Sequence, residues 1–402
     1  MEKKEIKKID LVYSGWIGAP NGASRFVALL KQNKINFRNK HIELDVFSLD
    51  IFKKKEFSNP SKVENRNNIK SILNKISRFS SILTFLLIYI QYIRHAKKIV
   101  NYYLRYCDNK GSGIFFQDLF ACYYYIRNRN KNNRQTIFLT CHDNGDLWNM
   151  FEIIYPKVKT GFIKKFFNKI TMEILENVDY IGFVSDSSRN NFCSIFPSYP
   201  IEKTYFVYNG IKEKDFGYKI KNNSEDYVTF ICVGTICERK NQIGIIEAIS
   251  FLDQEIQKRI RIIFVGDGDM KNEIISRCNN IKSKILFTGN TNNVDDFLIN
   301  SDCFILFSKD EGLPISIIEA LRVGLPIIGS NVAGIPEMIK DGINGYLVNL
   351  NIKDLGNAIL KIIKNKSRLL EMGNKSKLIF KEKFTLEKMI ENYSNLFYKR
   401  IS

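Results

Sequence analysis

The sequence predicts an α/β protein with two Rossmann-like domains, each built on a parallel sheet covered by helices. Three observations lead to this prediction. The chain has 402 residues, more than one hydrophobic core usually spans. Its 45% hydrophobic and 26% charged residues are typical of a globular protein. Short apolar runs alternate with helix-length segments along the whole chain, the pattern of a parallel sheet with crossover helices.

Six apolar runs in the first half are expected to be strands, with helices in the intervals between them. These runs cover residues 8–14, 41–48, 113–117, 136–140, 180–185 and 204–208. Residues 212–226 are polar and have no sustained apolar periodicity, so the linker between the domains is expected there. The first domain is therefore predicted to cover residues 1–212.

The second half repeats the pattern with six more apolar runs. These cover residues 228–234, 261–266, 284–289, 303–308, 326–330 and 345–348. The second domain is predicted at residues 213–380. A further helix is expected at 384–398, with Thr385 as its cap. Residues 381–402 are predicted to form a C-terminal helix that crosses back to the first domain.

A cytoplasmic location is expected from three features. Charged residues 1–8 run directly into the first strand, which leaves no apolar stretch for a signal peptide. The longest apolar candidate, residues 82–93, is shorter than the roughly 20 residues that a membrane-spanning helix needs. The eight cysteines form no CxxC pair and mostly lie in apolar runs, as buried thiols do in reducing compartments.

The positive charge is concentrated in the first half. Residues 1–212 carry +16 of the formal net charge of +19. Residues 161–170 place Phe and Ile apart from Lys at helical spacing, which is typical of a helix at a membrane surface. An amphipathic helix packed on its own sheet explains this spacing equally well. For residues 72–106 we expect a buried apolar face with basic flanks that favour lipid.

A glycine-containing loop follows the first predicted strand. Gly15, Gly18 and Gly22 precede a helix, so backbone amides there can converge on an anion. The spacing is not that of a GxGxxG dinucleotide motif, and no acidic ribose ligand follows where that motif requires one. An ordinary tight turn between strand and helix is equally compatible with these residues.

The second half carries the stronger signals. Arg239 and Lys240 follow its first strand and can neutralise a diphosphate, although a solvated charged turn would look the same. Glu311 follows its fourth strand, and Glu319 lies eight positions later on a helix that Pro314 opens. Ligands of open α/β sheets bind at the carboxyl ends of the strands, so Glu311 is suited to gripping sugar hydroxyls and Glu319 to binding a ribose diol.

Together these motifs resemble the retaining, two-domain GT-B glycosyltransferases of family 4. The resemblance runs from Gly15 to Phe384 and is densest at 233–348. Its main segments are Asn21-Gly22, Tyr208-Asn209-Gly210-Ile211, 233–241, Val265-Gly266-Asp267-Gly268, Phe287-Thr288-Gly289, 311–321, 324–328, 334–337 and 344–348. One departure is Thr235, where many members of the family have Arg.

The resemblance implies roles for individual residues. Glu311 would orient the donor sugar as the first Glu of the Glu-x7-Glu motif, and His142 would lie near that sugar as a second catalytic residue. The other implied positions are Arg239, Lys240 and Gly18 for the donor diphosphate, Gly312 and Leu313 for the donor sugar, and Glu319, Gly234, Gly266, Gly268 and Gly289 for the nucleotide.

The resemblance also implies an activity. It is sugar transfer with retention at the anomeric carbon, without a metal or a cofactor, from a UDP- or GDP-linked sugar to a saccharide acceptor. The basic first domain favours a lipid-linked acceptor at the inner face of a bacterial membrane, as in capsule or lipopolysaccharide synthesis. The chain is then a cytoplasmic, peripheral membrane protein with no nucleic-acid partner.

Other functions remain open. A sugar-nucleotide epimerase or an inverting transferase could use the same scaffold, although the spacing of Glu311 and Glu319 argues against both. A non-catalytic protein that binds anions or nucleic acid would account for the charge of +19. Against it, the phosphate-binding features lie in the nearly neutral half, and no nucleic-acid module is recognisable. Thr235 is the one hint of a degenerate, structural member of the fold.

Overall fold

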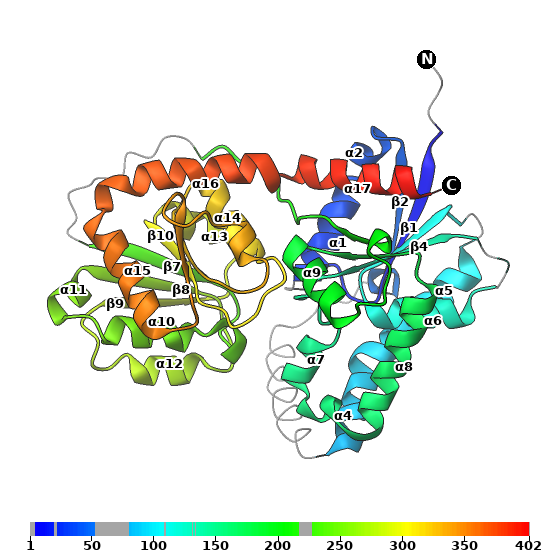
Figure 1. Cartoon of the computed structure of the whole chain (residues 1–402), viewed down its shortest axis with the longest axis horizontal. Coiled ribbons are helices and arrows are strands. Elements are labelled where there is room, and N and C mark those ends of the chain that lie inside the picture. Colours follow the sequence, from blue (N-terminus) through cyan, green and yellow to red (C-terminus); the bar gives the residue numbers. More distant parts are fainter. Residues whose placement is uncertain are drawn as a thin grey trace. The chain divides into compact units, whose positions relative to one another are not determined.

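The computed structural model describes residues 5–19, 22–52, 80–107, 110–130, 132, 134–216 and 227–401. The chain forms two compact units (Figure 1). Unit 1 comprises Met1–Val207 and Met389–Ser402, and unit 2 comprises Tyr208–Lys388. Of the expected linker at 212–226, residues 217–226 lie outside the described residues.

Unit 1 is built on a parallel sheet in the order β2-β1-β3-β4-β5-β6. Its strands are β1 Lys7–Tyr13, β2 Ile42–Ser48, β3 Gly113–Phe116, β4 Thr136–Cys141, β5 Tyr180–Phe183 and β6 Thr204–Phe206. The order reverses at β1, which has β2 on one side and β3 on the other. Such a switch point opens a crevice at the carboxyl ends of the strands, where ligands of this fold class bind.

Helices cover both faces of this sheet (Figure 1). They are α1 Gly22–Gln32, α2 Lys34–Arg38, α4 Ser81–Ile88, α5 Arg94–Tyr106, α6 Leu119–Asn128, α7 Asn149–Ile154, α8 Gly161–Asn177, α9 Asp186–Ile195 and α17 Leu386–Arg400. The side chains of β3 point alternately to the two faces of the sheet. Ile114 and Phe116 enter the core beneath α5, α6 and α8, whereas Phe115 contacts α17.

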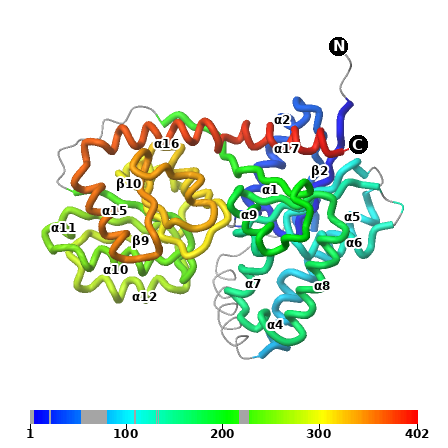
Figure 2. Tube along the Cα trace, viewed as in Figure 1, coloured from blue at the N-terminus to red at the C-terminus, as the bar shows by residue number. Residues whose placement is uncertain are grey.

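The last helix, α17, belongs mostly to unit 1 (Figure 2). Thr385 precedes it, and its Oγ1 accepts a hydrogen bond from the Lys388 amide at 3.2 Å. Tyr393 and Phe397 are buried, and their rings lie 5.5 and 5.1 Å from the ring of Phe115. Aromatic burial of this kind fixes the helix on the sheet.

Unit 2 has a second parallel sheet, in the order β12-β11-β10-β7-β8-β9. Its strands are β7 Val228–Val233, β8 Ile260–Val265, β9 Lys284–Gly289, β10 Cys303–Leu306, β11 Ile327–Ser330 and β12 Gly345–Val348. Its helices are α10 Gln242–Ser250, α11 Gln254–Lys258, α12 Lys271–Arg277, α13 Val294–Ile299, α14 Ile315–Val323, α15 Ile352–Lys364 and α16 Leu369–Lys383. The group α10, α12 and α15 and the group α13, α14 and α16 cover opposite faces (Figure 1).

The predicted fold class is confirmed. A strand lies at every place where the apolar runs predicted one, with ends that differ by at most two residues. The long helix expected at 72–106 is described only from Ser80 onward, since residues 72–79 lie outside the described residues. From there it consists of α4, a π-helical turn Tyr89–Ile93 and α5. The π turn adds one residue to the helical repeat and so rotates the faces of α4 and α5 relative to each other.

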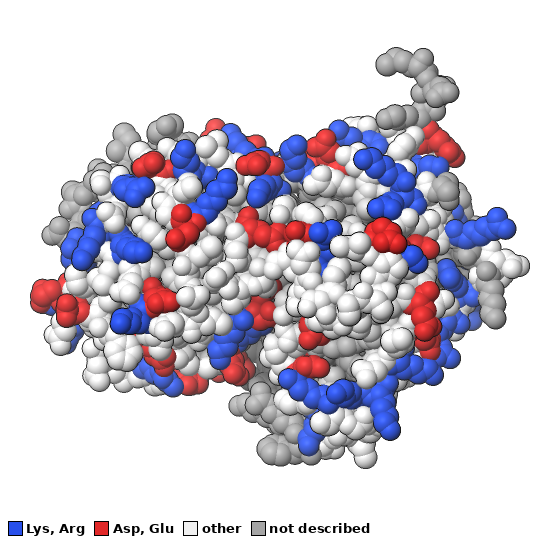
Figure 3. Space-filling view, viewed as in Figure 1, with Lys and Arg blue, Asp and Glu red and all other residues white. Residues whose placement is uncertain are grey.

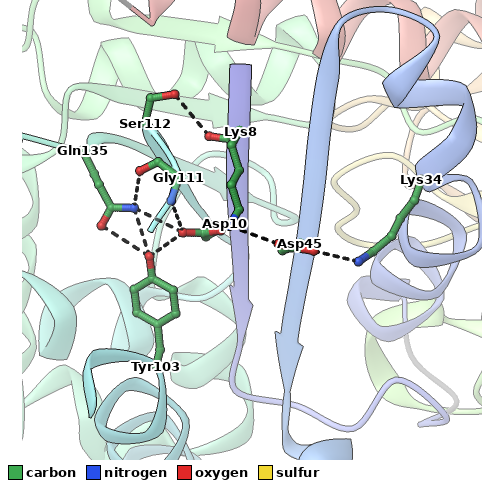
Figure 4. Close-up of polar contacts among 8 residues, drawn as sticks. All are labelled: Lys8, Asp10, Lys34, Asp45, Tyr103, Gly111, Ser112 and Gln135. Carbon is green, nitrogen blue, oxygen red and sulfur yellow. Dashed lines mark hydrogen bonds and ion pairs between the residues drawn. The ribbon is translucent and has the colours of Figure 1, made fainter. Parts of the chain in front are cut away.

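A buried carboxyl group lies in the middle of β1 (Figure 4). Asp10 is 0% exposed, and its Oδ2 accepts hydrogen bonds from the Tyr103 hydroxyl and the Gly111 amide, both at 2.6 Å. Gln135 contributes a longer bond of 3.4 Å. Burial raises the pKa of Asp10 above its usual value, although these hydrogen bonds oppose the rise. The group is therefore more stable in its protonated form than an exposed aspartate is.

We expect Asp10→Asn to change how stability depends on pH. Because the folded-state pKa of Asp10 is raised, its contribution is fully present below the unfolded pKa and is lost as pH rises through the folded pKa. Asn keeps an acceptor for Tyr103 and Gly111 but cannot ionise. Urea unfolding between pH 4 and pH 8 should show the variant gaining stability relative to wild type as pH rises. Parallel profiles for the two proteins would contradict this account.

Candidate functional site

The candidate site lies at the carboxyl edge of the unit 2 sheet. β7 and β10 are neighbours in that sheet, so the loops that follow them meet. The loop after β7 contains a short 3-10 turn, Glu238–Lys240, and the loop after β10 carries Glu311. Backbone contacts fasten the loops together, because the Lys309 amide donates to the Arg239 carbonyl at 2.8 Å. The two cations and the acid predicted from sequence are thus brought together.

Three side chains form the centre of this site. Lys240 Nζ lies 2.6 Å from Glu311 Oε1, and Arg239 Nη1 lies 3.1 Å from the same oxygen. Arg239 Nη1 also donates to the Asp310 carbonyl at 2.6 Å. The Glu311 side chain is 7% exposed, whereas those of Lys240 and Arg239 are 11% and 21% exposed. We call Arg239, Lys240 and Glu311 the ion cluster.

The ion cluster is charged at neutral pH. Burial alone would raise the pKa of Glu311, but Lys240 and Arg239 outweigh it, so the pKa lies below its ordinary value. Glu311 is therefore a carboxylate, and with two cations the cluster carries one net positive charge. That charge suits a phosphate group. Among the described residues, no group of three or more His, Cys, Asp and Glu is placed to hold a metal ion.

Hydrogen bonds of the buried Gln242 side chain hold the loop that carries Arg239 and Lys240. Gln242 is 1% exposed, and its Nε2 donates to the Thr235 carbonyl at 2.9 Å, while its Oε1 accepts from the Cys237 amide at 3.4 Å. The stem of Lys240 lies over Gly234, where an added Cβ would be 3.5 Å from Lys240 Cε. Sequence analysis missed Gln242, because a glutamine at the start of a helix usually indicates a solvated position.

The start of α14 supplies further polar groups beside Glu311. Gly312 and Leu313 are buried, and no hydrogen bond within the described residues occupies their amides. The sequence predicted that α14 begins at Pro314. In the structure Pro314 is the N-cap residue, and the helix begins one residue later, at Ile315. Glu319 lies within α14 and is half-buried. Two backbone donors therefore lie beside Glu311, and a second carboxylate lies about one turn into the helix.

The glycines predicted to face the nucleotide have a structural reason of their own. A side chain on Gly266, whose φ is +138°, would collide with the Gly234 carbonyl, and one on Gly268 would collide with the Ile236 carbonyl. The Gly266 amide donates to the Gly289 carbonyl at 3.0 Å. These glycines allow the loops after β7, β8 and β9 to pack closely. Their contact with a nucleotide remains a prediction.

In unit 1, two backbone amides of the loop after β1 already donate hydrogen bonds to carboxylates. The Ser14 amide donates to Asp118 Oδ2 at 3.1 Å, and the Ile17 amide donates to Asp50 Oδ2 at 2.7 Å. These carboxylates hold the loop and reduce its affinity for an anion. The predicted role of Gly18 in diphosphate binding therefore depends on its own amide, for which the described residues supply no partner. Asn21, part of the motif, lies outside the described residues.

His142 lies at the carboxyl end of β4, next to Gln117 at the end of β3. Its Nε2 is 2.7 Å from Gln117 Oε1, and its ring is 5.1 Å from the ring of Phe26. Burial lowers the pKa of His142 to about 4, so the imidazole is neutral at physiological pH. With Nε2 donating to Gln117, Nδ1 is left as an acceptor. Sequence analysis missed Gln117, which has no local motif.

Comparison with known proteins finds a family match in unit 2. Residues 214–378, nearly all of unit 2, match the family described as glycosyl transferases group 1. This part of the chain is similar to that family. The matched segment contains the whole ion cluster and the start of α14.

The chain is also similar to curated proteins from several bacteria. It is 27% identical over 234 residues to N-acetyl-alpha-D-glucosaminyl L-malate synthase of Bacillus anthracis, which covers 56% of this chain and 60% of that protein. It is 29% identical over 193 residues to UDP-Gal:alpha-D-GlcNAc-diphosphoundecaprenol alpha-1,3-galactosyltransferase of Escherichia coli, which covers 46% of this chain and 48% of that protein. The matches thus span about half to three fifths of these relatives.

Solved structures establish the GT-B fold for this chain. Anabaena Alr3699/HepE, solved in complex with UDP, aligns with a TM-score of 0.66 over 97% of this chain and 99% of that one. The sequence identity is 15%, so this likeness concerns the fold alone. It confirms the predicted architecture of two Rossmann-like domains.

Proposed function

We propose that this chain is a retaining glycosyltransferase that moves a sugar from a nucleotide-sugar donor to a saccharide acceptor. The observation that carries the proposal is the ion cluster at the carboxyl edge of the unit 2 sheet. It combines two cations with a buried carboxylate, as a site needs if it is to hold a diphosphate and a sugar together. Unit 2 is proposed as the donor-binding domain and unit 1 as the acceptor-binding domain.

The ion cluster suits the charge changes of the reaction. The bond from the anomeric carbon to the diphosphate oxygen breaks, a bond to the acceptor oxygen forms, and the acceptor hydroxyl gives its proton to the leaving diphosphate. Negative charge then develops on the leaving diphosphate, where Arg239 and Lys240 stabilise it. Glu311 accepts hydrogen bonds from sugar hydroxyls, and the amides of Gly312 and Leu313 donate to the sugar. Glu319 is proposed to bind the nucleotide ribose.

The donor is proposed to be a UDP-linked sugar, with a GDP-linked sugar as the second candidate. The E. coli relative is named for UDP-Gal, and the Anabaena structure contains UDP. A thermal-shift panel of nucleotide sugars tests this proposal. A donor at a hundred times its Kd stabilises the native state by about 2.7 kcal/mol, which raises Tm by several degrees. If no nucleotide sugar at millimolar concentration shifts Tm, the proposal fails.

The acceptor is proposed to be a lipid-linked saccharide of bacterial surface polysaccharide synthesis. The name of the E. coli relative specifies a diphosphoundecaprenol-linked acceptor. A relative from Staphylococcus aureus, 28% identical over 249 residues, is described as a capsular polysaccharide biosynthesis glycosyltransferase. Such an acceptor is anchored in a membrane, so an enzyme that acts on it benefits from binding the membrane surface.

The end of unit 1 formed by α4 and α8 supplies a surface for this purpose. Phe85 of α4 packs against Phe162 and Phe166 of α8, with ring centroids 5.7 and 5.4 Å apart. Around this contact Ile82 is 77% exposed and Phe162 is 50% exposed. Most of the apolar face of α8 packs inward on its own unit, so the lipid contact involves only the residues that stay exposed.

Lysines surround these exposed apolar side chains. Lys164 and Lys165 are exposed on α8, and Lys and Arg side chains gather over this end of unit 1 (Figure 3). We propose that this surface holds the chain at the anionic inner face of the cytoplasmic membrane.

In the part of the chain that the structure describes, no helix is long and apolar enough to span a bilayer. All eight cysteines lie in described residues and are free thiols.

The double substitution Lys164→Gln/Lys165→Gln should weaken binding to anionic vesicles. Each lysine near such a surface contributes about 1 kcal/mol, so the loss of two should weaken binding about thirtyfold. Sedimentation with phosphatidylglycerol vesicles at low and high salt measures it. Lys375→Gln/Lys377→Gln, which removes two exposed lysines from α16 of unit 2, is the matched control. Equal binding by all three proteins, or tight binding to RNA instead, would contradict the proposal.

A further inference from the structure

Both cations of the ion cluster bind one oxygen of Glu311. Lys240 Nζ and Arg239 Nη1 lie 2.6 and 3.1 Å from Oε1. Within the described residues, Lys240 Nζ has no other ion-pair or hydrogen-bond partner. The charge that a diphosphate needs is therefore already engaged by an internal carboxylate, and a diphosphate can bind fully only if it competes with Glu311 for Lys240.

The surrounding backbone prevents the loops from simply moving apart. The Arg239 carbonyl accepts from the Lys309 amide at 2.8 Å, and Arg239 Nη1 donates to the Asp310 carbonyl at 2.6 Å. Gln242 holds the loop after β7 from its buried side. Exchange of partners therefore has to occur by rotation of the Lys240 side chain, while Glu311 keeps its place.

When the Lys240 side chain turns to a diphosphate, the buried carboxylate of Glu311 loses one of its two charged partners. Its side chain is 7% exposed, and a buried carboxylate that loses a charged partner is strongly destabilised unless other donors replace it. Sugar hydroxyl groups are such donors, and a nucleotide sugar brings them next to its own diphosphate. A free nucleoside diphosphate brings none.

We infer that Glu311 makes the site discriminate between a sugar-linked diphosphate and a free nucleoside diphosphate, by competing with the diphosphate for Lys240 and Arg239. This inference rests on the proposed function, because it assumes that the ion cluster binds the diphosphate of the donor. It assigns Glu311 a second task. Besides holding the sugar, it weakens the binding of the spent nucleotide, which then leaves the site once the sugar has been transferred.

Calorimetric binding of UDP and of inorganic pyrophosphate tests this inference on the full chain. Glu311→Gln and Glu311→Ala both remove the competing charge, and both should bind UDP and pyrophosphate about tenfold more tightly than wild type, as expected for removing one nearby charge at moderate screening. The preference for the best nucleotide sugar of the thermal-shift panel over its own nucleoside diphosphate should fall by a similar factor. A role in folding alone would weaken binding instead.

Glu238→Gln is the matched control. It removes the same charge from the neighbouring loop, but its side chain is 74% exposed and pairs with Lys309, so affinity should change by less than about twofold. Thermal unfolding shows whether each variant is native. If native Glu311 variants bind UDP and pyrophosphate no more tightly than wild type, the inference is wrong while the proposed function stands. If neither wild type nor any variant binds pyrophosphate or a nucleotide, the ion cluster is not a diphosphate site, and both fail.

Discussion

Replacing Glu311 by Gln should reduce sugar transfer about a hundredfold to a thousandfold, the usual effect of losing one preorganised electrostatic contact to a transition state. Glutamine has nearly the same shape and keeps one acceptor oxygen for a sugar hydroxyl. It loses the negative charge that stabilises the positive character of the anomeric carbon as the diphosphate departs. The loss should appear mainly in kcat, because the charge matters more in the transition state than in the bound donor.

Steady-state assays with the donor found by the thermal-shift panel measure this loss. Circular dichroism and thermal unfolding should show a folded protein, since the substitution changes no volume at a position that is 7% exposed. Glu238→Gln, in the neighbouring loop, should retain nearly full turnover. Near-normal turnover by Glu311→Gln would end the assignment of a catalytic role to this residue.

Replacing Lys240 by Ala should lower kcat/KM for the donor by about tenfold to a hundredfold, as expected when one charge-assisted contact to a phosphate is lost. The donor KM should rise, since the diphosphate loses one of its two cations. Turnover should also fall, because less positive charge remains to stabilise the leaving group. Arg239 stays fixed by the Asp310 carbonyl and retains part of the site's charge.

Lys309→Ala is a suitable control for the Lys240 variant. Lys309 lies on the facing loop, but its side chain is 49% exposed and pairs with Glu238 rather than with Glu311. Its removal should leave the donor KM within about twofold of wild type, because an exposed charge is screened by solvent. Unaltered kinetics in Lys240→Ala would refute the assignment of this lysine to the diphosphate.

Much of the fold was predictable because a buried parallel strand leaves a local mark. The run Val228–Val233 is buried throughout and is apolar except for Thr229, so its place could be read from sequence. The π turn at Tyr89–Ile93 could not be predicted, because one extra residue in a helical turn does not alter the amino-acid composition of the segment. Asp10 was equally unexpected, because a charged residue in a strand usually faces solvent, and its partners Tyr103 and Gln135 come from distant segments.

The candidate site was predictable where strand ends determine it. Arg239, Lys240 and Glu311 each follow a strand, and the carboxyl ends of parallel strands share one edge. Sheet order makes β7 and β10 neighbours, and side-chain packing brings both cations to one oxygen of Glu311. Neither of these features could be predicted from the sequence. Gln242 and Gln117 were missed for a related reason. Each is buried, and its hydrogen-bond partners become apparent only when segments distant in sequence or on a folded loop come together.

The most direct test of the central claim is a crystal structure of this chain with a bound nucleotide sugar. In that structure the diphosphate should contact Lys240 and Arg239, Glu311 should accept a hydrogen bond from the sugar, and Lys240 should have turned away from Glu311. A nucleotide sugar bound elsewhere, with the three side chains still paired only with one another, would contradict this claim.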